Sequence, residues 1–324
     1  MSSILNGTPE SFKVSRHETA HNHQSHKSSS LGNFRDFETF NMIFFIFFLL
    51  SACYIIGLVI ENMSLTNKVV IVTGASSGIG AATAIIFARE GANVVVTGRN
   101  EKNLHSVMEK CGQVGKKAFA IKADVSKDNE AATIIQKTID KFGKLDVLIN
   151  NAGILKLSSI LEKNTVETFD EVINTNLRAV FVLCHLAAPY LVKTKGNIVN
   201  VSSVAGSMQQ PGYSAYCTSK AGLNHFSRVI AMELASSGVR VNTVSPGPVE
   251  TPIFETAGAD ISWDYLKSLT ALNKISKAEE IGELIAFVAS DKAESITGSN
   301  YLDHFYHFFL LLGLIDVIKG SEML

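Results

Sequence analysis

Cysteine is scarce in this sequence, and the few residues present form no recognisable pattern. The four cysteines, Cys53, Cys111, Cys184 and Cys217, show neither paired spacing nor metal-ligand spacing. They indicate free thiols in a reducing compartment rather than a disulfide framework. An excess of charge of one sign is lacking as well, because the formal net charge is −1. A basic surface for a nucleic-acid partner is therefore not expected.

Aliphatic side chains are sparse in residues 1–39, which are rich in serine, histidine and asparagine. This composition is typical of a disordered polar tail. Four histidines lie close together in it, but without cysteine or a structured scaffold a metal site there is disfavoured: His17, His21, His23 and His26. We predict no metal site in the chain.

Charge is absent from residues 42–60, which read MIFFIFFLLSACYIIGLVI. Nineteen apolar residues are about the length that crosses a bilayer as a helix, so we predict a single-pass membrane anchor of undecided orientation. A cleaved signal peptide fits poorly, since the run starts far from the N-terminus and no cleavage site follows. A second interpretation makes residues 1–62 an alternative or mis-assigned first exon, with a soluble cytoplasmic protein starting at Met63.

The remainder, residues 63–302, alternates between strand and helix patterns, and the 46% hydrophobic content of the chain supports a sizeable core. Residues 68–73 (KVVIVT) form a β-branched run typical of a strand buried on both faces of a parallel sheet. Further strands are expected at 93–97, 118–122, 147–149, 198–201 and 239–244, and helices at about 78–90, 129–142, 168–192 and 214–236. This order predicts an α/β fold, a Rossmann-type doubly wound parallel sheet in a single domain.

Residues suited to ligand binding follow the ends of these strands, where such sheets bind ligands. The first strand runs into Gly74-Ala75-Ser76-Ser77-Gly78-Ile79-Gly80, a turn that lets a pyrophosphate approach the backbone at a helix N-terminus. The second ends at Arg99, where NAD-binding folds place a carboxylate on the ribose. An arginine there suits a 2′-phosphate, so NADP(H) is preferred over NAD(H). A solvated loop arginine is the alternative.

Tyr216 and Lys220 lie four residues apart on one face of a predicted helix. A nearby cation favours a phenolate, and one charge at ~4 Å supplies the ~3–4 kcal/mol that lowers a phenol pKa by about two to three units. Ser203, at a strand end, can hydrogen-bond the carbonyl or alcohol oxygen that Tyr216 protonates or deprotonates. Such a pair alone is more often an ordinary tyrosine and a solvated lysine, so its interpretation depends on the motifs upstream.

Together these motifs resemble the short-chain dehydrogenase/reductase family over residues 66–302, in the single-domain branch of 3-oxoacyl-acyl-carrier-protein-reductase-like members. The matching pieces are the TGASSGIG turn, Asp124-Val125, the NNAG block, Asn176-Leu177, Ser203, Tyr216 with Lys220, and Ser245 through Thr251. The resemblance implies a carbonyl/alcohol oxidoreductase that assembles as a homodimer or homotetramer, partly through the long helices around Asn176 and Tyr216.

The resemblance also implies roles for individual residues. Tyr216 would be the general acid/base, Lys220 would lower its pKa and hold the nicotinamide ribose, Ser203 would fix the substrate carbonyl, and Asn176 would hold a relay water. The implied cofactor-binding residues are Gly74, Ser76, Gly78, Ile79, Gly80, Arg99, Asp124, Asn151, Ala152, Gly153, Tyr216, Lys220, Pro246, Gly247, Val249 and Thr251.

Two further segments compare differently with the family: the first corresponds to a variable part of it, and the second departs from its pattern. Residues 254–272 correspond to the variable substrate lid, and their apolar side chains hint at a lipid-like or ring substrate. After Asp303 the usual Val-Asp-Gly-Gly type of ending is missing, and residues 303–324 form an atypical apolar tail. Its run 308–315 is too short to span a membrane. This departure leaves a second hypothesis, a non-catalytic dinucleotide-binding protein with a disrupted C-terminus.

Overall fold

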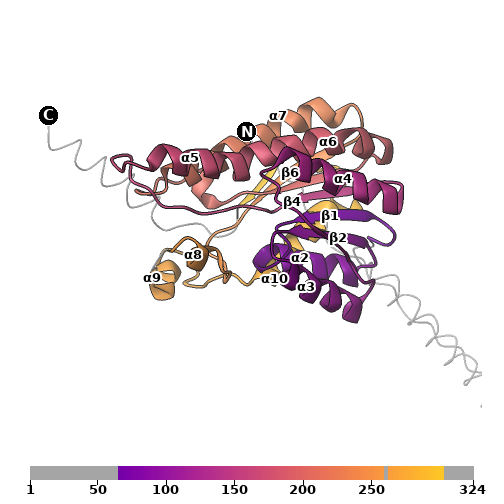
Figure 1. Cartoon of the computed structure of the whole chain (residues 1–324), viewed down its shortest axis with the longest axis horizontal. Helices are drawn as coiled ribbons and strands as arrows, with labels where there is room; N and C mark the ends of the chain where they lie inside the picture. The colour runs from indigo at the N-terminus through magenta and orange to yellow at the C-terminus, as the bar shows by residue number, and fades with distance from the viewer. Residues whose placement is uncertain (1–64, 259–261, 303–324) are drawn as a thin grey trace, which may run out of the picture. The chain divides into compact units, whose positions relative to one another are not determined.

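A computed structural model describes residues 65–258 and 262–302, which form one seven-stranded parallel sheet with helices on both faces (Figure 1). The strand order is β3-β2-β1-β4-β5-β6-β7. The strands are β1 (Val69–Thr73), β2 (Asn93–Gly98), β3 (Phe119–Lys122), β4 (Val147–Asn150), β5 (Asn197–Val201), β6 (Arg240–Ser245) and β7 (Asn300–Leu302). The predicted Rossmann-type doubly wound sheet is confirmed. The predicted membrane anchor at 42–60, the tail at 1–39 and the tail at 303–324 lie outside the described residues.

Helices cover the two faces of the sheet because each carries an apolar stripe that the strands bury. One face holds α2 (Gly78–Arg89), α3 (Glu101–Val114) and α10 (Ala278–Ala289), whose core includes Phe87, Leu104 and Ile285. The other holds α4 (Asp128–Phe142), α6 (Ala179–Thr194) and α7 (Ser214–Ala235), with Ile134, Leu183 and Leu223 buried among them. The sequence analysis does not identify α3 or α10.

One helical run, Thr165–Thr194, is long and apolar enough to cross a membrane, judged by length and composition within the described part of the chain. It consists of α5 (Thr165–Ile173), a π-helical turn (Asn174–Arg178) and α6. Leu183, Ala187 and Leu191 on α6 are buried against the sheet. Packing in the core therefore accounts for its apolar character.

The described residues 253–258 and 262–272, between β6 and α10, form the segment that we call the lid. It contains two short helices, α8 (Ile253–Thr256) and α9 (Trp263–Ser268). The rings of Phe254 and Trp263 meet edge to face at 5.8 Å and brace one helix against the other. In Figure 1 the lid projects from the same end of the sheet as α5. This end is the carboxyl edge of the strands.

Candidate active site

A cavity of about 960 Å³ opens at the carboxyl edge of the sheet. The order of strands reverses between β1 and β4, and ligands bind beside such a switch point. Among the predicted site residues, only Gly80 and Asn176 are not in its wall. The others line it: Gly74, Ser76, Gly78, Ile79, Arg99, Asp124, Asn151, Ala152, Gly153, Ser203, Tyr216, Lys220, Pro246, Gly247, Val249 and Thr251.

The glycine turn after β1 is shaped by close backbone contacts. Gly74 and Gly78 have φ angles of +64° and +54°, which favour glycine. A Cβ at Gly80 would stand 2.6 Å from the carbonyl oxygen of Gly74, so Gly80 serves the packing of the turn rather than its lining. The side chain of Ser77 makes no capping hydrogen bond to α2, so the first N–H groups of this helix are left for a ligand. The turn can hold a phosphate.

Asn151 ties the end of β4 to this turn. Its Nδ2 donates to the carbonyl oxygens of Thr73 at 2.9 Å and Gly74 at 3.2 Å. In return, Thr73 Oγ1 accepts the N–H groups of Asn151 and Ala152, each at 3.0 Å. Thr73 is a site-shaping residue that the sequence analysis missed. Its hydroxyl at the end of an aliphatic strand is the signal that could have identified it.

Arg99 and Asp124 stand at the ends of β2 and β3 in the cavity wall. Arg99 is exposed. Partial burial of Asp124 acts to raise its pKa, but hydrogen bonds from Ser126 and the charges of Arg99 and Lys127 lower it overall. Arg99 thus places a positive charge close to Asp124, on the side of the cavity where the glycine turn lies.

Lys220 is almost fully buried beneath the cavity, with an exposed fraction of 4%. Its Nζ donates to the carbonyl oxygen of Val201 at 2.9 Å. Ser202 Oγ donates to the carbonyl oxygen of Lys220 at 3.2 Å, which fixes α7 against the end of β5. Burial lowers the pKa of Lys220 to about 8, because loss of water disfavours the ammonium. The group still carries its proton at neutral pH.

Tyr216 lies half-buried one helical turn before Lys220 and shares a hydrogen bond with Ser203. Burial raises the pKa of Tyr216 to about 12, and the hydrogen bond with Ser203 offsets only part of this rise. The Nζ of Lys220 is 5.7 Å from the centroid of the tyrosine ring. The sequence predicts that Lys220 lowers the pKa of Tyr216. The net shift in the structure is upward, and its largest cause is desolvation of the phenol rather than any charge.

Asn176 is fully buried in the π-helical turn between α5 and α6. Its Oδ1 accepts the N–H of Ile154 at 2.8 Å, and its Nδ2 donates to the carbonyl oxygen of Ile154 at 2.9 Å and to Ser219 Oγ at 3.2 Å. A Cβ on Gly153 would lie 3.4 Å from Asn176 Oδ1 and 3.6 Å from Lys220 Nζ. Asn176 therefore borders the lysine, while its amide holds the segment after β4. π-turns of this kind are frequent at functional sites.

A row of buried polar side chains crosses the sheet beneath the cavity. Asn150 Nδ2 donates to Asn200 Oδ1 at 2.9 Å, Asn200 Nδ2 donates to Ser227 Oγ at 2.8 Å, and Ser227 Oγ donates to the carbonyl oxygen of Leu223 at 2.7 Å. Asn150 and Asn200 are direct neighbours in the pairing of β4 with β5. The row joins both strands to the helix that carries Tyr216 and Lys220.

The cavity continues past Tyr216 into a compartment that the sequence analysis described only in part. The segment after β4, the loop after β5 and the lid form its wall. Its members that were not predicted include Leu155, Lys156, Leu157, Glu171, Met208, Gln210 and Tyr213. Apart from Tyr213, three residues before Tyr216, they carry no motif that could have identified them.

Known proteins resemble this chain over the same region. The short chain dehydrogenase family matches residues 68–262. The 3-oxoacyl-acyl-carrier-protein reductase FabG of Thermotoga maritima is 38% identical over 237 residues, covering 73% of this chain and 96% of that protein. Cyclohexanol dehydrogenase of an Acinetobacter species is 33% identical over 244 residues, covering 75% and 96%.

A crystal structure from Caenorhabditis elegans shows the same fold. It is a short-chain dehydrogenase/reductase of unknown function, with cofactor, and is 35% identical to this chain at a TM-score of 0.70. The match covers 74% of this chain and 94% of that one. The family match spans more than half of the chain, and the FabG match spans nearly the whole of that relative. This chain therefore belongs to the short-chain dehydrogenase family and is an NAD(P)-dependent oxidoreductase acting on CH–OH groups.

Proposed function

We propose that the protein is an NADP(H)-dependent oxidoreductase that interconverts a carbonyl and a secondary alcohol, with Tyr216 as the general acid/base. The observation that carries this proposal is the side-chain hydrogen bond between Ser203 and Tyr216, together with the buried Lys220, whose Nζ lies 5.7 Å from the centroid of the tyrosine ring. All three residues line the same cavity as the glycine turn. The non-catalytic alternative depends on residues 303–324, which lie outside the described residues, whereas the sheet that continues through β7 supports the catalytic proposal.

A nicotinamide cofactor held by the glycine turn and Lys220 would supply the hydride for reduction of the carbonyl carbon. Ser203 and Tyr216 hold the carbonyl oxygen between their hydroxyls, and Tyr216 gives its proton to that oxygen as the alcohol forms. A phenol with a pKa of about 12 is fully protonated at neutral pH, which suits this role. Lys220 places a positive charge beside the phenolate that is left, and Asn176 holds the neighbouring backbone in position.

The preference for NADP(H) follows from the end of β2. Arg99 is exposed in the cavity wall and can bind a 2′-phosphate. It occupies the position where folds that bind NAD have a carboxylate for the ribose hydroxyl. NAD(H) fits the glycine turn equally well, so it remains a usable but weaker cofactor. The other predicted cofactor residues, from Asn151 to Thr251, surround the same space.

An apolar substrate suits the rest of the cavity. The names of two relatives, 3-oxoacyl-acyl-carrier-protein reductase and cyclohexanol dehydrogenase, indicate different substrates, so the relatives do not fix the substrate of this chain. In this chain the lid contributes Phe254, Leu266 and Leu269 to the wall. We take a small apolar ketone or secondary alcohol as the substrate class.

A screen with full-length protein tests the function. NADPH absorbance at neutral pH is followed across a panel of aliphatic and cyclic ketones. We expect oxidation of NADPH with at least one apolar ketone, and turnover lower by about 10²–10⁴-fold in Tyr216→Phe protein that still binds NADPH by fluorescence titration. Binding of NADPH without reduction of any ketone in the wild type would contradict the proposal.

Two further parts of the proposal concern the setting of the enzyme. We propose that residues 42–60 anchor it to a membrane, because their length and composition suit a bilayer span. Full-length protein should then stay in the pellet after carbonate extraction, whereas a version starting at Met63 should not.

We also propose a homodimer or homotetramer, since α5, α6 and α7 expose the apolar side chains of Val166, Phe181 and Met232. Light scattering of the version starting at Met63 should show more than one subunit.

A further inference from the structure

The compartment beyond Tyr216 is walled mainly by apolar side chains. Leu155 and Leu157 come from the segment after β4, Met208 from the loop after β5, and Leu266 and Leu269 from the lid. A substrate held by Ser203 and Tyr216 extends into this compartment. Its chemistry therefore decides which substituents the enzyme accepts.

Only two charged side chains belong to this compartment among the described residues that line the cavity. Lys156 comes from the segment after β4, and Glu171 comes from α5. They form an ion pair between Lys156 Nζ and Glu171 Oε2. The other charged lining residues are Arg99 and Asp124 on the side of the glycine turn, and the buried Lys220.

The pair removes the net charge that each partner alone would bring to the wall. A lone Lys156 would attract carboxylates and phosphates, because an ammonium is a strong anion binder. When Glu171 is paired with Lys156, an anionic group on the substrate can reach the ammonium only by displacing the Glu171 carboxylate. The displaced carboxylate would remain close to that group, and two negative charges at close range repel each other. Glu167, one turn earlier on α5, is exposed and does not line the cavity, so it takes no part in this effect.

We infer that Glu171 masks Lys156 and thereby makes the enzyme select uncharged substrates over anionic ones. The inference rests on the proposed function, because it concerns the substrates of the same cavity. Glu171 is a specificity residue here and takes no part in hydride or proton transfer. Small carboxylates and phosphate-bearing thioesters belong to the rejected class.

The experiment compares matched neutral and anionic ketones with NADPH. The pairs are 2-decanone with 9-oxodecanoate and cyclohexanone with 4-oxocyclohexanecarboxylate, assayed in wild type and Glu171→Gln. The readout is the ratio of kcat/KM for the anionic ketone to that for the neutral ketone. We expect the wild-type ratio to lie well below one, and Glu171→Gln to raise it about three- to tenfold, chiefly through a lower KM. Both side chains are about half exposed, which keeps the effect modest.

Two controls isolate the pair. Glu167→Gln removes the same charge from the same helix without touching the cavity wall, so its ratio should match wild type. The double variant Lys156→Gln/Glu171→Gln also lacks the Lys156 ammonium. Its ratio of kcat/KM for the anionic ketone to that for the neutral ketone should therefore not show the rise expected of Glu171→Gln. Thermal melting of each variant shows that the fold is retained.

The outcomes separate the inference from the proposed function. Reduction of the neutral ketones with an unchanged ratio in Glu171→Gln would overturn the inference and leave the function standing. An equal gain in Glu167→Gln would also overturn it, because a general loss of negative charge would then explain the effect. Absence of turnover with every ketone in wild type would defeat the proposed function, and the inference with it.

Discussion

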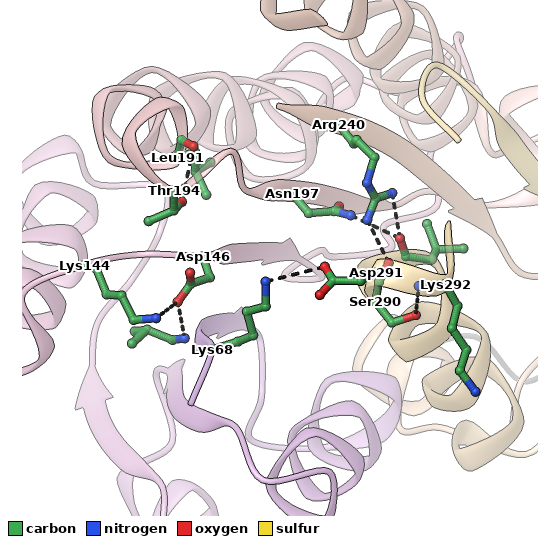
Figure 2. A network of polar contacts seen from close by, with 12 residues as sticks. Lys68, Lys144, Asp146, Leu191, Thr194, Asn197, Arg240, Ser290, Asp291 and Lys292 are labelled. Atoms are coloured by element: carbon green, nitrogen blue, oxygen red, sulfur yellow. Dashed lines mark hydrogen bonds and ion pairs between the residues drawn. The ribbon is translucent and has the colours of Figure 1, made fainter. Parts of the chain in front are cut away.

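The two edges of the sheet use polar side chains in opposite ways. At the amino edge, shown in Figure 2, charges are committed to one another or to the backbone. Asp146 Oδ2 accepts the N–H of Val69 at 2.7 Å and pairs with Lys144 at 2.8 Å, and Lys68 pairs with Asp291 at 3.4 Å. These contacts close the edge and join β1 to β4.

Arg240 completes this pattern at the start of β6. Its guanidinium donates to the carbonyl oxygens of Val288, Ser290 and Ile296 at 3.0–3.1 Å, which ties the end of α10 to the sheet. Figure 2 shows Arg240 beside Ser290. Asn197 Nδ2 donates to the carbonyl oxygen of Val288 at 3.1 Å as well. Burial lowers the pKa of Arg240, but with three carbonyl partners the group has a structural role.

At the carboxyl edge, by contrast, ionisable groups are buried with few partners. Lys220 has one backbone acceptor for its ammonium, and its pKa falls to about 8. Tyr216 meets Ser203, and its pKa rises to about 12. Groups whose charged forms are disfavoured in this way cluster where chemistry is performed. Both edges contain desolvated groups, but the buried Arg240 at the amino edge has three carbonyl partners, whereas Lys220 and Tyr216 at the carboxyl edge have one hydrogen-bond partner each.

Among the changes that test this difference between the edges, Tyr216→Phe should have the largest effect, and that effect should be on turnover. Loss of the transferable proton should lower turnover about 10²–10⁴-fold, while the ring keeps its packing and NADPH still binds. Steady-state rates paired with cofactor fluorescence titration measure both quantities. Tyr213→Phe makes the same chemical change in the same cavity wall and should lower turnover far less. Equal losses in the two variants would remove Tyr216 from its proposed role.

The second largest effect should be a dependence of the free energy of unfolding on pH, caused by the lowered pKa of Lys220. Its folded pKa of about 8 lies below the unfolded value of 10.5, so between these pH values the unfolded chain holds one more proton. The free energy of unfolding should therefore rise by about 3 kcal/mol from pH 8 to 10.5, relative to Lys220→Met. Urea unfolding of both proteins across that range measures the difference. Parallel curves would show that Lys220 is not desolvated.

Asp146→Ala probes the amino edge, where stability rather than turnover should respond. The change removes a carboxylate that accepts the buried N–H of Val69 and pairs with Lys144. We expect the free energy of unfolding to fall by about 2 kcal/mol, with little change in kcat. Asp140→Ala on the exposed side of α4 serves as the control and should cost less than about 0.5 kcal/mol. A large fall in kcat in folded Asp146→Ala protein would break the division between the edges.

The smallest expected effect concerns Arg99. Arg99→Ala should weaken NADPH binding about tenfold and leave NADH binding nearly unchanged, because only NADPH carries the 2′-phosphate. Titration with both cofactors measures the selectivity directly. If wild type and Arg99→Ala share one NADPH/NADH selectivity, the arginine does not read the phosphate.

The strands and the cavity wall could be predicted because their signals are local. Runs such as residues 69–73 are continuous and β-branched, and the glycine turn and the Tyr216–Lys220 spacing lie in short motifs. The helix α3 escaped because only Leu104, Val107 and Cys111 form its buried stripe, which is narrow in a mostly polar segment.

Features that arise only on folding could not be predicted. The π-turn around Asn176 depends on its amide reaching the backbone of Ile154, 22 residues earlier. The net upward shift in the pKa of Tyr216 was not predicted, because a pairwise distance argument contains the cation but not the loss of water. The ion pair of Lys156 and Glu171 likewise joins two segments whose approach leaves no mark in the sequence.

The buried row of Asn150, Asn200 and Ser227 has a consequence for strand register. A slip of β5 by one residue against β4 would turn Asn200 to the other face of the sheet. The amide of Asn150 and the hydroxyl of Ser227 would then both lose Asn200 as a hydrogen-bond partner in a dry interior. The row thus sets the distance between the end of β5, which carries Ser203, and α7, which carries Tyr216. Insertions in the exposed loop at 207–211 can then change which substrates enter while the reacting hydroxyls keep their spacing.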